Sequence, residues 1–243
     1  MQVAEYKNMF ALETTHWWYT TLHKLVECSV NKEWKGSQLK ILDAGCGTGS
    51  MMEIVSKYGV VAGIDNSSQA VSFAKSRGLK NVYEQDLNLW QGPPDFYDII
   101  LSLDVLYAVE NDSSILKKIY STLKPGGTLI LNLPAFEMLR REHDVVVNTK
   151  RRYQKKQFIK ELTQIGFIIK TASYRQVHLF VFIYFRKLFS KLFKQKADPE
   201  SDLKKSSSWV NTILESYGSI ENRMILSGIC LPVGSSLFVV AKK

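Results

Sequence analysis

The residues with the clearest chemical meaning are an acid and three glycines between positions 43 and 49. Asp43 follows a short apolar stretch, Lys40 to Leu42, and the glycines stand at alternate positions, Gly45, Gly47 and Gly49. Glycine lets the turn between a strand and a helix come close to a ligand and point free N–H groups at it. The pattern therefore predicts a nucleotide-binding turn at the end of a strand.

The spacing of the glycines distinguishes between nucleotides. A dinucleotide-binding loop of the Gly-x-Gly-x-x-Gly type would place its third glycine at position 50, which is Ser50. An acid at position 43 would also repel a pyrophosphate, whereas it suits a ligand that carries positive charge. Both features disfavour an NAD-dependent oxidoreductase. A thermal shift on addition of NAD would distinguish such an enzyme from one that binds another cofactor.

Residues 43–49, Asp-Ala-Gly-Cys-Gly-Thr-Gly, resemble the first motif of class I S-adenosylmethionine-dependent methyltransferases. The resemblance implies that S-adenosylmethionine is the cofactor, held at its amino-acid end and ribose by the acid and the glycine loop. It also implies an α/β fold with a Rossmann-like, seven-stranded, mostly parallel sheet, an antiparallel last strand and helices on both faces. A helical insertion is expected between strands six and seven. A glycine-rich turn without a ligand is the alternative.

Two further acids stand where the next two strands are expected to end. Val60 to Ile64 reads as a buried strand that leads into Asp65, where an acid can accept hydrogen bonds from two ribose hydroxyls. An acid there can also cap the following helix, and the two roles are compatible. Asn81 to Glu84 reads as a third strand. The resemblance assigns the adenine amino group to Asp86, and a ring nitrogen to the backbone N–H of Leu87.

The N-terminal region adds an aromatic candidate. An acid followed by His16-Trp17-Trp18-Tyr19 resembles a group of small bacterial methyltransferases in which an N-terminal helix closes over the cofactor. Members of that group often carry an arginine after the tyrosine, where this chain has Thr20. The predicted cofactor-binding residues are Tyr19, Asp43, Gly45, Cys46, Gly47, Gly49, Asp65, Asn66, Asp86, Leu87 and Leu103.

The connection at residues 134–156 is placed over the methyl-transfer site by the same resemblance. His143 is the best candidate for a general base, and Arg151, Arg152 and Tyr153 are the best candidates for binding an anion. A hydroxyl or ammonium acceptor benefits from a base, whereas a carboxylate mainly needs cations to position it. His143 is equally compatible with an ordinary surface loop. The predicted catalytic residues are His143, Arg152 and Tyr153.

One departure from the family pattern limits which residue roles can be assigned to this chain. Family members usually carry Leu-Glu-His-Val after the fourth strand, whereas this chain has Leu106-Tyr107-Ala108-Val109. Any role of that Glu-His pair is therefore not assigned here.

Hydrophobic periodicity and glycine or proline stops indicate the elements that position these residues. Residues 3–30 show helical spacing in two pieces, and the glycine loop leads into a helix at 51–57. We expect a single methyltransferase domain over 1–243, with an N-terminal helical lid at 1–35, an active-site link at 134–156 and a helical insertion at 176–235. The other expected strands are 98–104, 128–133, 167–175 and 236–241, and the other helices are 113–123, 157–165 and 208–226.

Within the insertion, Val177 to Phe193 reads as a helix with a wide apolar face. It is too short and too charged to span a bilayer. It could lie in a membrane interface, with Arg186, Lys187, Lys191 and Lys194 facing anionic head groups, or cover the sheet and line an acceptor pocket. Either arrangement implies an acceptor with apolar surface.

Composition narrows the remaining classes. The chain has 243 residues, 45% of them hydrophobic, which is enough for one substantial core. The net charge of +9 is compatible with an acidic partner, but the basic clusters lack the signature of a common RNA-binding module, so nucleic acid is disfavoured.

The three cysteines and four histidines show no disulfide framework and no metal-ligand spacing, so no metal is expected. No secretory signal is recognised, so we expect a cytoplasmic protein, either free or peripheral at the inner membrane face.

These observations predict an S-adenosylmethionine-dependent methyltransferase. The acceptor is expected to be an apolar or amphipathic small molecule, lipid-linked intermediate or peptide, methylated at oxygen as a hydroxyl or carboxyl group. The alternative is a non-catalytic cofactor-binding protein that docks to a partner through its basic helical insertion.

Overall fold

The computed structural model describes residues 3–140, 144, 148–193 and 207–243, and leaves the side chains of residues 3–4 and 187–193 undescribed. His143 therefore lies outside the described residues. Across the described chain, no helix combines the length and hydrophobicity that crossing a bilayer requires.

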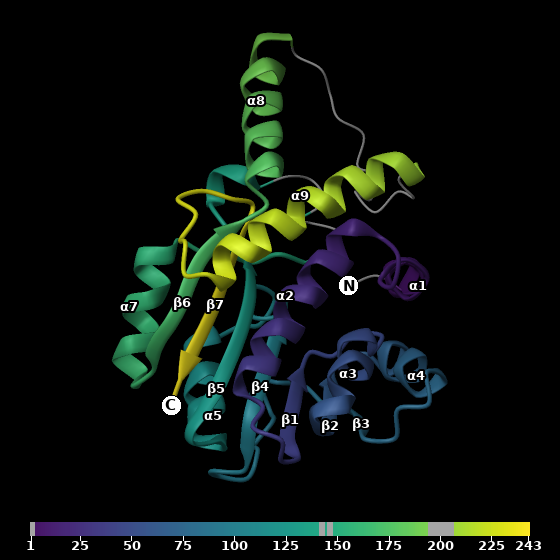
Figure 1. The fold of residues 1–243 in the computed structure, drawn as a ribbon, viewed down its shortest axis with the longest axis vertical. Coiled ribbons are helices and arrows are strands. Elements are labelled where there is room, and N and C mark those ends of the chain that lie inside the picture. Colours follow the sequence, from purple (N-terminus) through teal and green to yellow (C-terminus); the bar gives the residue numbers. More distant parts are fainter. Residues whose placement is uncertain (1–2, 141–143, 145–147, 194–206) are drawn as a thin grey trace.

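A central sheet with the strand order β3-β2-β1-β4-β5-β7-β6 organises the molecule (Figure 1). Neighbouring strands pair in parallel from β3 to β5, and β7 runs antiparallel to both β5 and β6. This arrangement confirms the predicted fold class. The strands are β1 (Leu39–Ala44), β2 (Gly59–Asp65), β3 (Val82–Glu84), β4 (Tyr97–Leu103), β5 (Leu123–Pro134), β6 (Ile168–Arg175) and β7 (Ser236–Lys242).

Helices cover both faces of the sheet (Figure 1). Their bounds are α1 (Val3–Leu12), α2 (Trp17–Glu33), α3 (Ser50–Val55), α4 (Ser68–Ser76), α5 (Asp112–Thr122), α7 (Lys155–Ile165), α8 (Val177–Phe193) and α9 (Ser208–Leu226), with short 3-10 turns η1 (Ser56–Tyr58) and η2 (Glu137–Leu139). The side chains of β4 show how the faces are divided. Ile100 packs into the cluster under α5 and α7, whereas Ile99 and Leu101 pack into the cluster that includes α2 and α3. Both faces are apolar because a mostly parallel sheet is buried on both sides.

The sheet contains a topological switch point between β1 and β4. β1 pairs with β2 on one side and with β4 on the other, so the chain winds outward in opposite directions from this pair. In open α/β sheets, ligands bind outside the carboxyl ends of the strands at such a point. The glycine loop follows β1 directly and therefore lies at the expected place.

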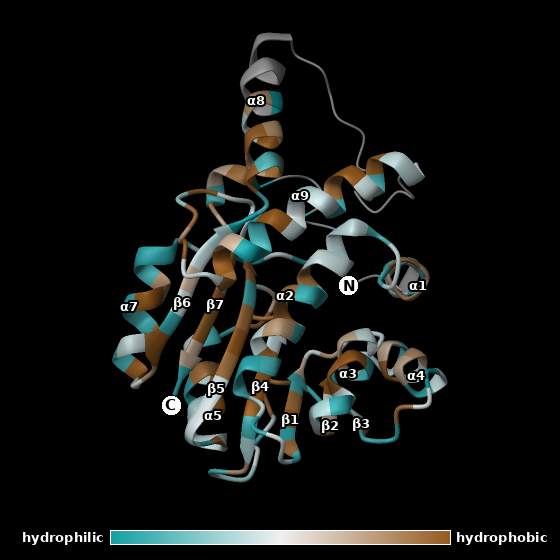
Figure 2. Cartoon of the chain, in the orientation of Figure 1, coloured by the Kyte–Doolittle hydropathy of each residue, from teal (hydrophilic) through white to brown (hydrophobic). Residues whose placement is uncertain are grey.

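The N-terminal helices and the insertion pack against each other. The backbone N–H of Trp17 donates to Asn211 Oδ1 over 2.8 Å, and Asn222 Nδ2 donates to the carbonyl of Thr21 over 2.7 Å. These bonds hold α2 beside α9, as Figure 1 also shows. By contrast, α8 projects from the body and carries hydrophobic residues on its described part (Figure 2).

Two elements differ from the sequence-based expectation. The helix expected at 51–57 is α3 followed by the 3-10 turn η1. The turn leads directly into β2 at Gly59, whose backbone lies so close to β1 that a Cβ atom would be 2.0 Å from the carbonyl oxygen of Leu39. β5 begins at Leu123, before the Pro-Gly-Gly segment, because Leu123 pairs with Tyr97 ahead of a register shift. Long-range pairing sets both boundaries.

Candidate active site

The glycine loop is held tightly between β4 and α1. Gly45, Gly47 and Gly49 all have positive φ angles, of 93°, 53° and 88°. A Cβ atom at Gly45 would lie 2.2 Å from Cγ2 of Val105, and one at Gly47 would lie 2.8 Å from Cε of Met9. Both the backbone conformation and the space therefore require glycine here.

Asp43 is the most unusual carboxylate at this edge of the sheet. Its residue is only 2% exposed, and no group in the described parts of the chain donates a hydrogen bond to it. Burial, and after it the charges of Asp65 and Glu13, raise the pKa of Asp43 to about 7. A buried acid without a donor or a cation is costly unless a ligand supplies one. Asp43 therefore fits a ligand that brings positive charge.

Asp65 faces the glycine loop from the end of β2. Its Oδ2 accepts from the N–H of Gly47 over 2.9 Å, and its Oδ1 accepts from the N–H of Ser67 over 3.0 Å. Burial raises its pKa, and these two donors oppose the shift. Each carboxylate oxygen retains a further acceptor position, so Asp65 can bind hydroxyls as well. The cap of α4 is Ser67 itself, whose Oγ accepts from the N–H of Ala70 over 3.3 Å.

The residues predicted to bind adenine lie after β3. Asp86 Oδ1 accepts from the backbone N–H and from Nδ2 of Asn88, both over 2.8 Å, while Leu87 is buried in the core. Asn66 is exposed and Leu103 is half-buried. Asp86 thus stabilises its own turn and keeps its second oxygen for other donors.

A carboxylate from the N-terminal segment ties α1 and α2 to the glycine loop. The hydroxyl of Thr48 donates to Glu13 Oε1, and Arg77 Nη2 approaches the same oxygen at 2.6 Å. Arg77 Nε also donates to the carbonyl of Thr48 over 2.9 Å. Glu13 is the acid ahead of the His-Trp-Trp-Tyr motif, and that position was the available signal in the sequence, from which no role was assigned.

Tyr19, on α2, lies close enough to Glu13, Asp104 and Glu5 for their charges to affect its hydroxyl. Burial raises its pKa, followed by the charges of Glu13, Asp104 and Glu5. Burial and the charge of Asp43 likewise raise the pKa of the Cys46 thiol. Both groups therefore stay protonated at neutral pH, so Tyr19 can donate a hydrogen bond to a ligand.

Three polar residues near this edge were not assigned from the sequence. Asn132 Nδ2 donates to Asp104 Oδ2 over 2.8 Å, and Arg175 Nη1 donates to Asn132 Oδ1 over 3.5 Å. Arg175 Nη2 also donates to Thr21 Oγ1 over 3.2 Å. The available sequence signals were an asparagine inside the apolar β5, an acid directly after β4 and an arginine at the end of β6.

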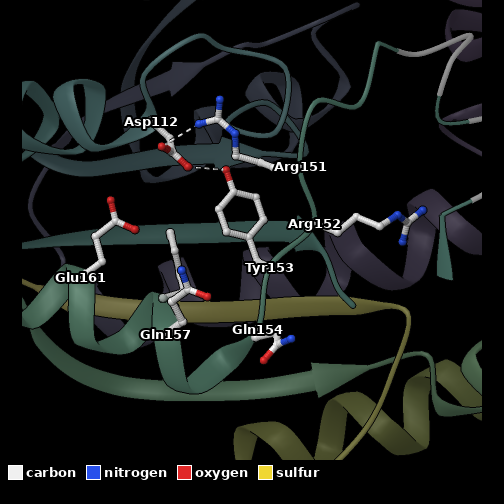
Figure 3. A pocket seen from close by; sticks show the side chains of 8 residues that line it. Asp112, Arg151, Arg152, Tyr153, Gln154, Gln157 and Glu161 are labelled. Carbon is white, nitrogen blue, oxygen red and sulfur yellow. Dashed lines mark hydrogen bonds and ion pairs between the residues drawn. The ribbon is translucent and has the colours of Figure 1, made fainter. Parts of the chain in front are cut away.

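Arg152 and Tyr153, the two predicted catalytic residues that the structure describes, bind different partners (Figure 3). Arg152 Nε and Nη2 each donate to Asp144 over 2.9 Å. Tyr153 instead donates its hydroxyl to Asp112 Oδ2 over 2.8 Å, and Arg151 Nη1 lies 2.6 Å from Asp112 Oδ1. Arg152 points away from this pair in Figure 3.

The Tyr153 group lines a cavity of about 250 Å³ between the link and α7. The residues that line it are Asp112, Arg151, Arg152, Tyr153, Gln154, Gln157, Phe158 and Glu161. The structure thus places the Tyr153 hydroxyl on the α5 and α7 side of the link. Arg152, by contrast, lies close enough to Asp104 for its charge to oppose the rise in the pKa of that acid.

Comparison with known proteins identifies the family. Residues 35–178 match the family described as methyltransferase domain. A phosphoethanolamine N-methyltransferase from Zea mays is 34% identical over 100 residues, which are 38% of this chain and 20% of the maize protein. A ubiquinone biosynthesis O-methyltransferase from Yersinia pestis is 25% identical over 185 residues, which are 67% of this chain and 76% of that protein.

Solved structures share the fold. The plantazolicin methyltransferase in complex with SAH has a TM-score of 0.62 at 16% identity, with 99% of this chain and 89% of that chain covered. A phosphoethanolamine N-methyltransferase from Haemonchus contortus in complex with S-adenosyl-L-methionine has a TM-score of 0.56 at 18% identity, with 89% of this chain and 52% of that chain covered. The match to this chain covers less than half the length of the first relatives: 20% of the maize protein and 42% of a ubiquinone biosynthesis O-methyltransferase from Coxiella burnetii.

Proposed function

This chain belongs to the methyltransferase-domain family, and from that premise we propose that it transfers the methyl group of S-adenosylmethionine to an acceptor molecule. The observation that carries the proposal is Asp43, a buried carboxylate to which no described residue donates a hydrogen bond, just before a loop whose glycines all have positive φ angles. When bound, the cofactor supplies a methyl group activated by a positively charged sulfur. The residues of the chain supply binding, orientation and exclusion of water.

Each part of the cofactor has a proposed partner at the carboxyl edge of the sheet. Asp43 and the glycine loop hold the amino-acid end, and Asp65 accepts the ribose hydroxyls. Asp86 and the backbone of Leu87 receive the adenine. Tyr19 donates from the N-terminal helices, while Cys46, Asn66 and Leu103 complete the walls. These assignments follow the family resemblance, and the carboxylates have acceptor positions available for them.

The acceptor is proposed to be a small molecule, a lipid-linked intermediate or a peptide, methylated at oxygen. The relatives support small-molecule chemistry, since their names include phosphoethanolamine and ubiquinone biosynthesis. Arg152 and, from the sequence alone, His143 are the residues of the 134–156 link proposed to act on the acceptor. Any contribution of Tyr153 acts through the position of the link, because its hydroxyl is bonded to Asp112.

We also propose a peripheral contact of α8 with an anionic membrane surface. Phe182 and Phe185 are 60% and 50% exposed on a helix that projects from the body (Figure 1). Apolar side chains of this size on a surface indicate an interaction site. Arg186 beside them is exposed, and more basic residues follow it in the sequence, as expected for a helix that lies in a lipid interface.

Calorimetry with S-adenosylmethionine tests the central proposal. Asp65→Ala and Asp86→Ala should each weaken binding by about 1–3 kcal/mol, because each leaves ligand donors unpaired in a buried site. Asp98→Ala, at the opposite end of β4, is the control and should bind normally. Equal affinity in all four proteins would remove the ribose and adenine assignments. Binding without transfer of labelled methyl to any component of a cell extract would favour the non-catalytic alternative.

A further inference from the structure

We propose that Asp104 contacts the methyl acceptor and takes its proton, so that the acceptor is a hydroxyl or an amine and not a carboxylate. This inference rests on the proposed methyltransferase function. It adds a residue to that function, excludes a carboxyl acceptor and extends the possible acceptor atom from oxygen to nitrogen. The support comes from the position of Asp104, its free oxygen and the groups that hold it.

Asp104 lies beside the glycine loop. β4 pairs with β1, with Leu101 opposite Asp43, and Asp104 follows three residues later, just beyond the carboxyl end of β4. The next residue, Val105, fills the space that a side chain at Gly45 would need. Asp104 is therefore at the switch point of the sheet, next to the loop that holds the amino-acid end of the cofactor.

The backbone and side chain of Asp104 are held in an unusual conformation. Its φ angle is +54°, which is uncommon for a residue other than glycine, and its N–H donates to the carbonyl of Asn132 over 2.8 Å. Asn132 Nδ2 bonds Oδ2 of Asp104, and no described residue donates to Oδ1. Such strained residues cluster at functional sites, and here the strain presents one carboxylate oxygen that is free to bind.

Asn132 and Arg175 act as positioning residues for this carboxylate. Asn132 is fully buried, and its amide accepts from Arg175 while it donates to Asp104, which fixes the orientation of the amide. Arg175 is 2% exposed, makes no ion pair with a described residue, and has no partner at Nε. Burial lowers the pKa of Arg175 to about 10, while the charges of Asp104, across Asn132, and of Glu221 favour its ionised form.

The charge state of Asp104 suits a proton acceptor. Burial raises its pKa to about 6, while Asn132, Arg175 and Arg152 oppose the rise. The acid is therefore ionised at neutral pH and basic enough to take a proton as the acceptor reacts. Tyr19 and Tyr107 lie close enough to Asp104 for its charge to add to the effect of burial, which raises the pKa of both phenols, so both stay neutral.

The transfer step balances with Asp104 as the base. The lone pair of the acceptor oxygen or nitrogen forms the bond to the methyl carbon, the carbon–sulfur bond breaks with its electron pair going to sulfur, and the acceptor proton goes to Asp104 Oδ1. A carboxylate acceptor carries no proton to remove and would be repelled by the charge of Asp104. An amine or hydroxyl would instead donate a hydrogen bond to it.

A binding experiment tests this without knowledge of the acceptor. Sinefungin is an analogue of S-adenosylmethionine in which a carbon bearing an amine replaces the methylated sulfur, so its ammonium group lies where the methyl group is transferred. The affinities of sinefungin and of S-adenosylhomocysteine are measured by calorimetry for the parent, Asp104→Asn and Asp98→Asn. The asparagine at position 104 can still accept the bond from Asn132, and Asp98 is the matched acid at the amino end of β4.

The parent and Asp98→Asn should bind sinefungin more tightly than S-adenosylhomocysteine. In Asp104→Asn the ratio of the two affinities should fall about tenfold, because sinefungin binds more weakly while the affinity for S-adenosylhomocysteine is retained. In the parent the preference should also fade below about pH 6, as Asp104 is protonated. An identical preference in the parent and Asp104→Asn would overturn the inference. If the parent binds neither ligand, the proposed function itself fails.

Discussion

The hydroxyl of Thr48 in the glycine loop donates a hydrogen bond to the carboxylate of Glu13, 35 positions earlier in the chain. The bond joins the segment between α1 and α2 to the loop that is proposed to hold the cofactor. The position of the N-terminal helices therefore depends on the conformation of the glycine loop. An ordered loop and a closed N-terminal segment stabilise each other.

Replacement of Glu13 should weaken this connection. Glu13→Gln removes the charge that Arg77 approaches at 2.6 Å, in a pair whose side chains are only 2% and 11% exposed. We expect the free energy of unfolding to fall by about 2–3 kcal/mol, since Arg77 is left without its buried partner. Urea denaturation measures the change. Glu27→Gln removes a more exposed pair with Lys57 and should have a much smaller effect, because solvent screens the pair. Equal losses in the two variants would contradict a special role of Glu13.

The affinity for the cofactor should rise with pH. The pKa of Asp43 in the free protein is about 7, and a bound cation favours the ionised carboxylate, so binding lowers this pKa and releases a proton. Affinity should therefore be about tenfold weaker at pH 6 than at pH 8. Calorimetry at both pH values, in buffers of different ionisation enthalpy, measures the affinity and the proton release. Asp43→Asn should bind weakly and with little pH dependence; a parent whose affinity is the same at both pH values would contradict the role of Asp43.

The link at 134–156 should affect turnover more than cofactor binding. Arg152 Nε donates to Asp144, and the charge of Arg152 opposes the rise in the pKa of Asp104, the proposed contact of the acceptor. Arg152→Ala and His143→Ala should therefore lower the rate of labelled methyl transfer while calorimetric affinity for the cofactor is retained. Rescue of His143→Ala alone at high pH would favour a hydroxyl acceptor over a carboxyl one. Full turnover in both variants would show that the link is structural.

Membrane binding through α8 should depend on its exposed phenylalanines. The parent should float with vesicles that contain anionic lipid and remain unbound with neutral vesicles, because both the apolar face and the basic residues contribute. Phe182→Asp/Phe185→Asp should not float, and a thermal unfolding midpoint close to that of the parent would show that it is folded. A parent that stays unbound to anionic vesicles would remove the membrane proposal.

A pair of substitutions on α9 serves as a control for this experiment. Trp209 and Ile213 are also exposed, at 69% and 59%, but lie on a different helix. Trp209→Asp/Ile213→Asp should retain flotation if α8 alone makes the contact. Loss of flotation in this variant would extend the membrane surface to α9.

The sequence by itself determined the family fold and the place of the glycine loop. Hydrophobic periodicity and glycine stops are local signals, so α8 and α9 were predicted with the bounds that the structure shows, and the expected end of β2 at Asp65 was confirmed. The glycines at 45, 47 and 49 were also informative, because a turn with positive φ angles selects glycine whatever packs around it. Boundaries that depend on pairing between distant strands, such as the start of β5, were not determined in this way.

Only the tertiary structure decided which polar groups meet. Asn132 and Arg175 are 43 positions apart in the chain. The sheet brings both near Asp104, with Asn132 on β5 beside β4 and Arg175 on β6, which lies one strand beyond β5 across β7. Sequence spacing carries no information about such contacts. In the same way, Arg152 and Tyr153 are neighbours in the chain but point to different partners, Asp144 and Asp112, because successive side chains of an extended segment face opposite sides.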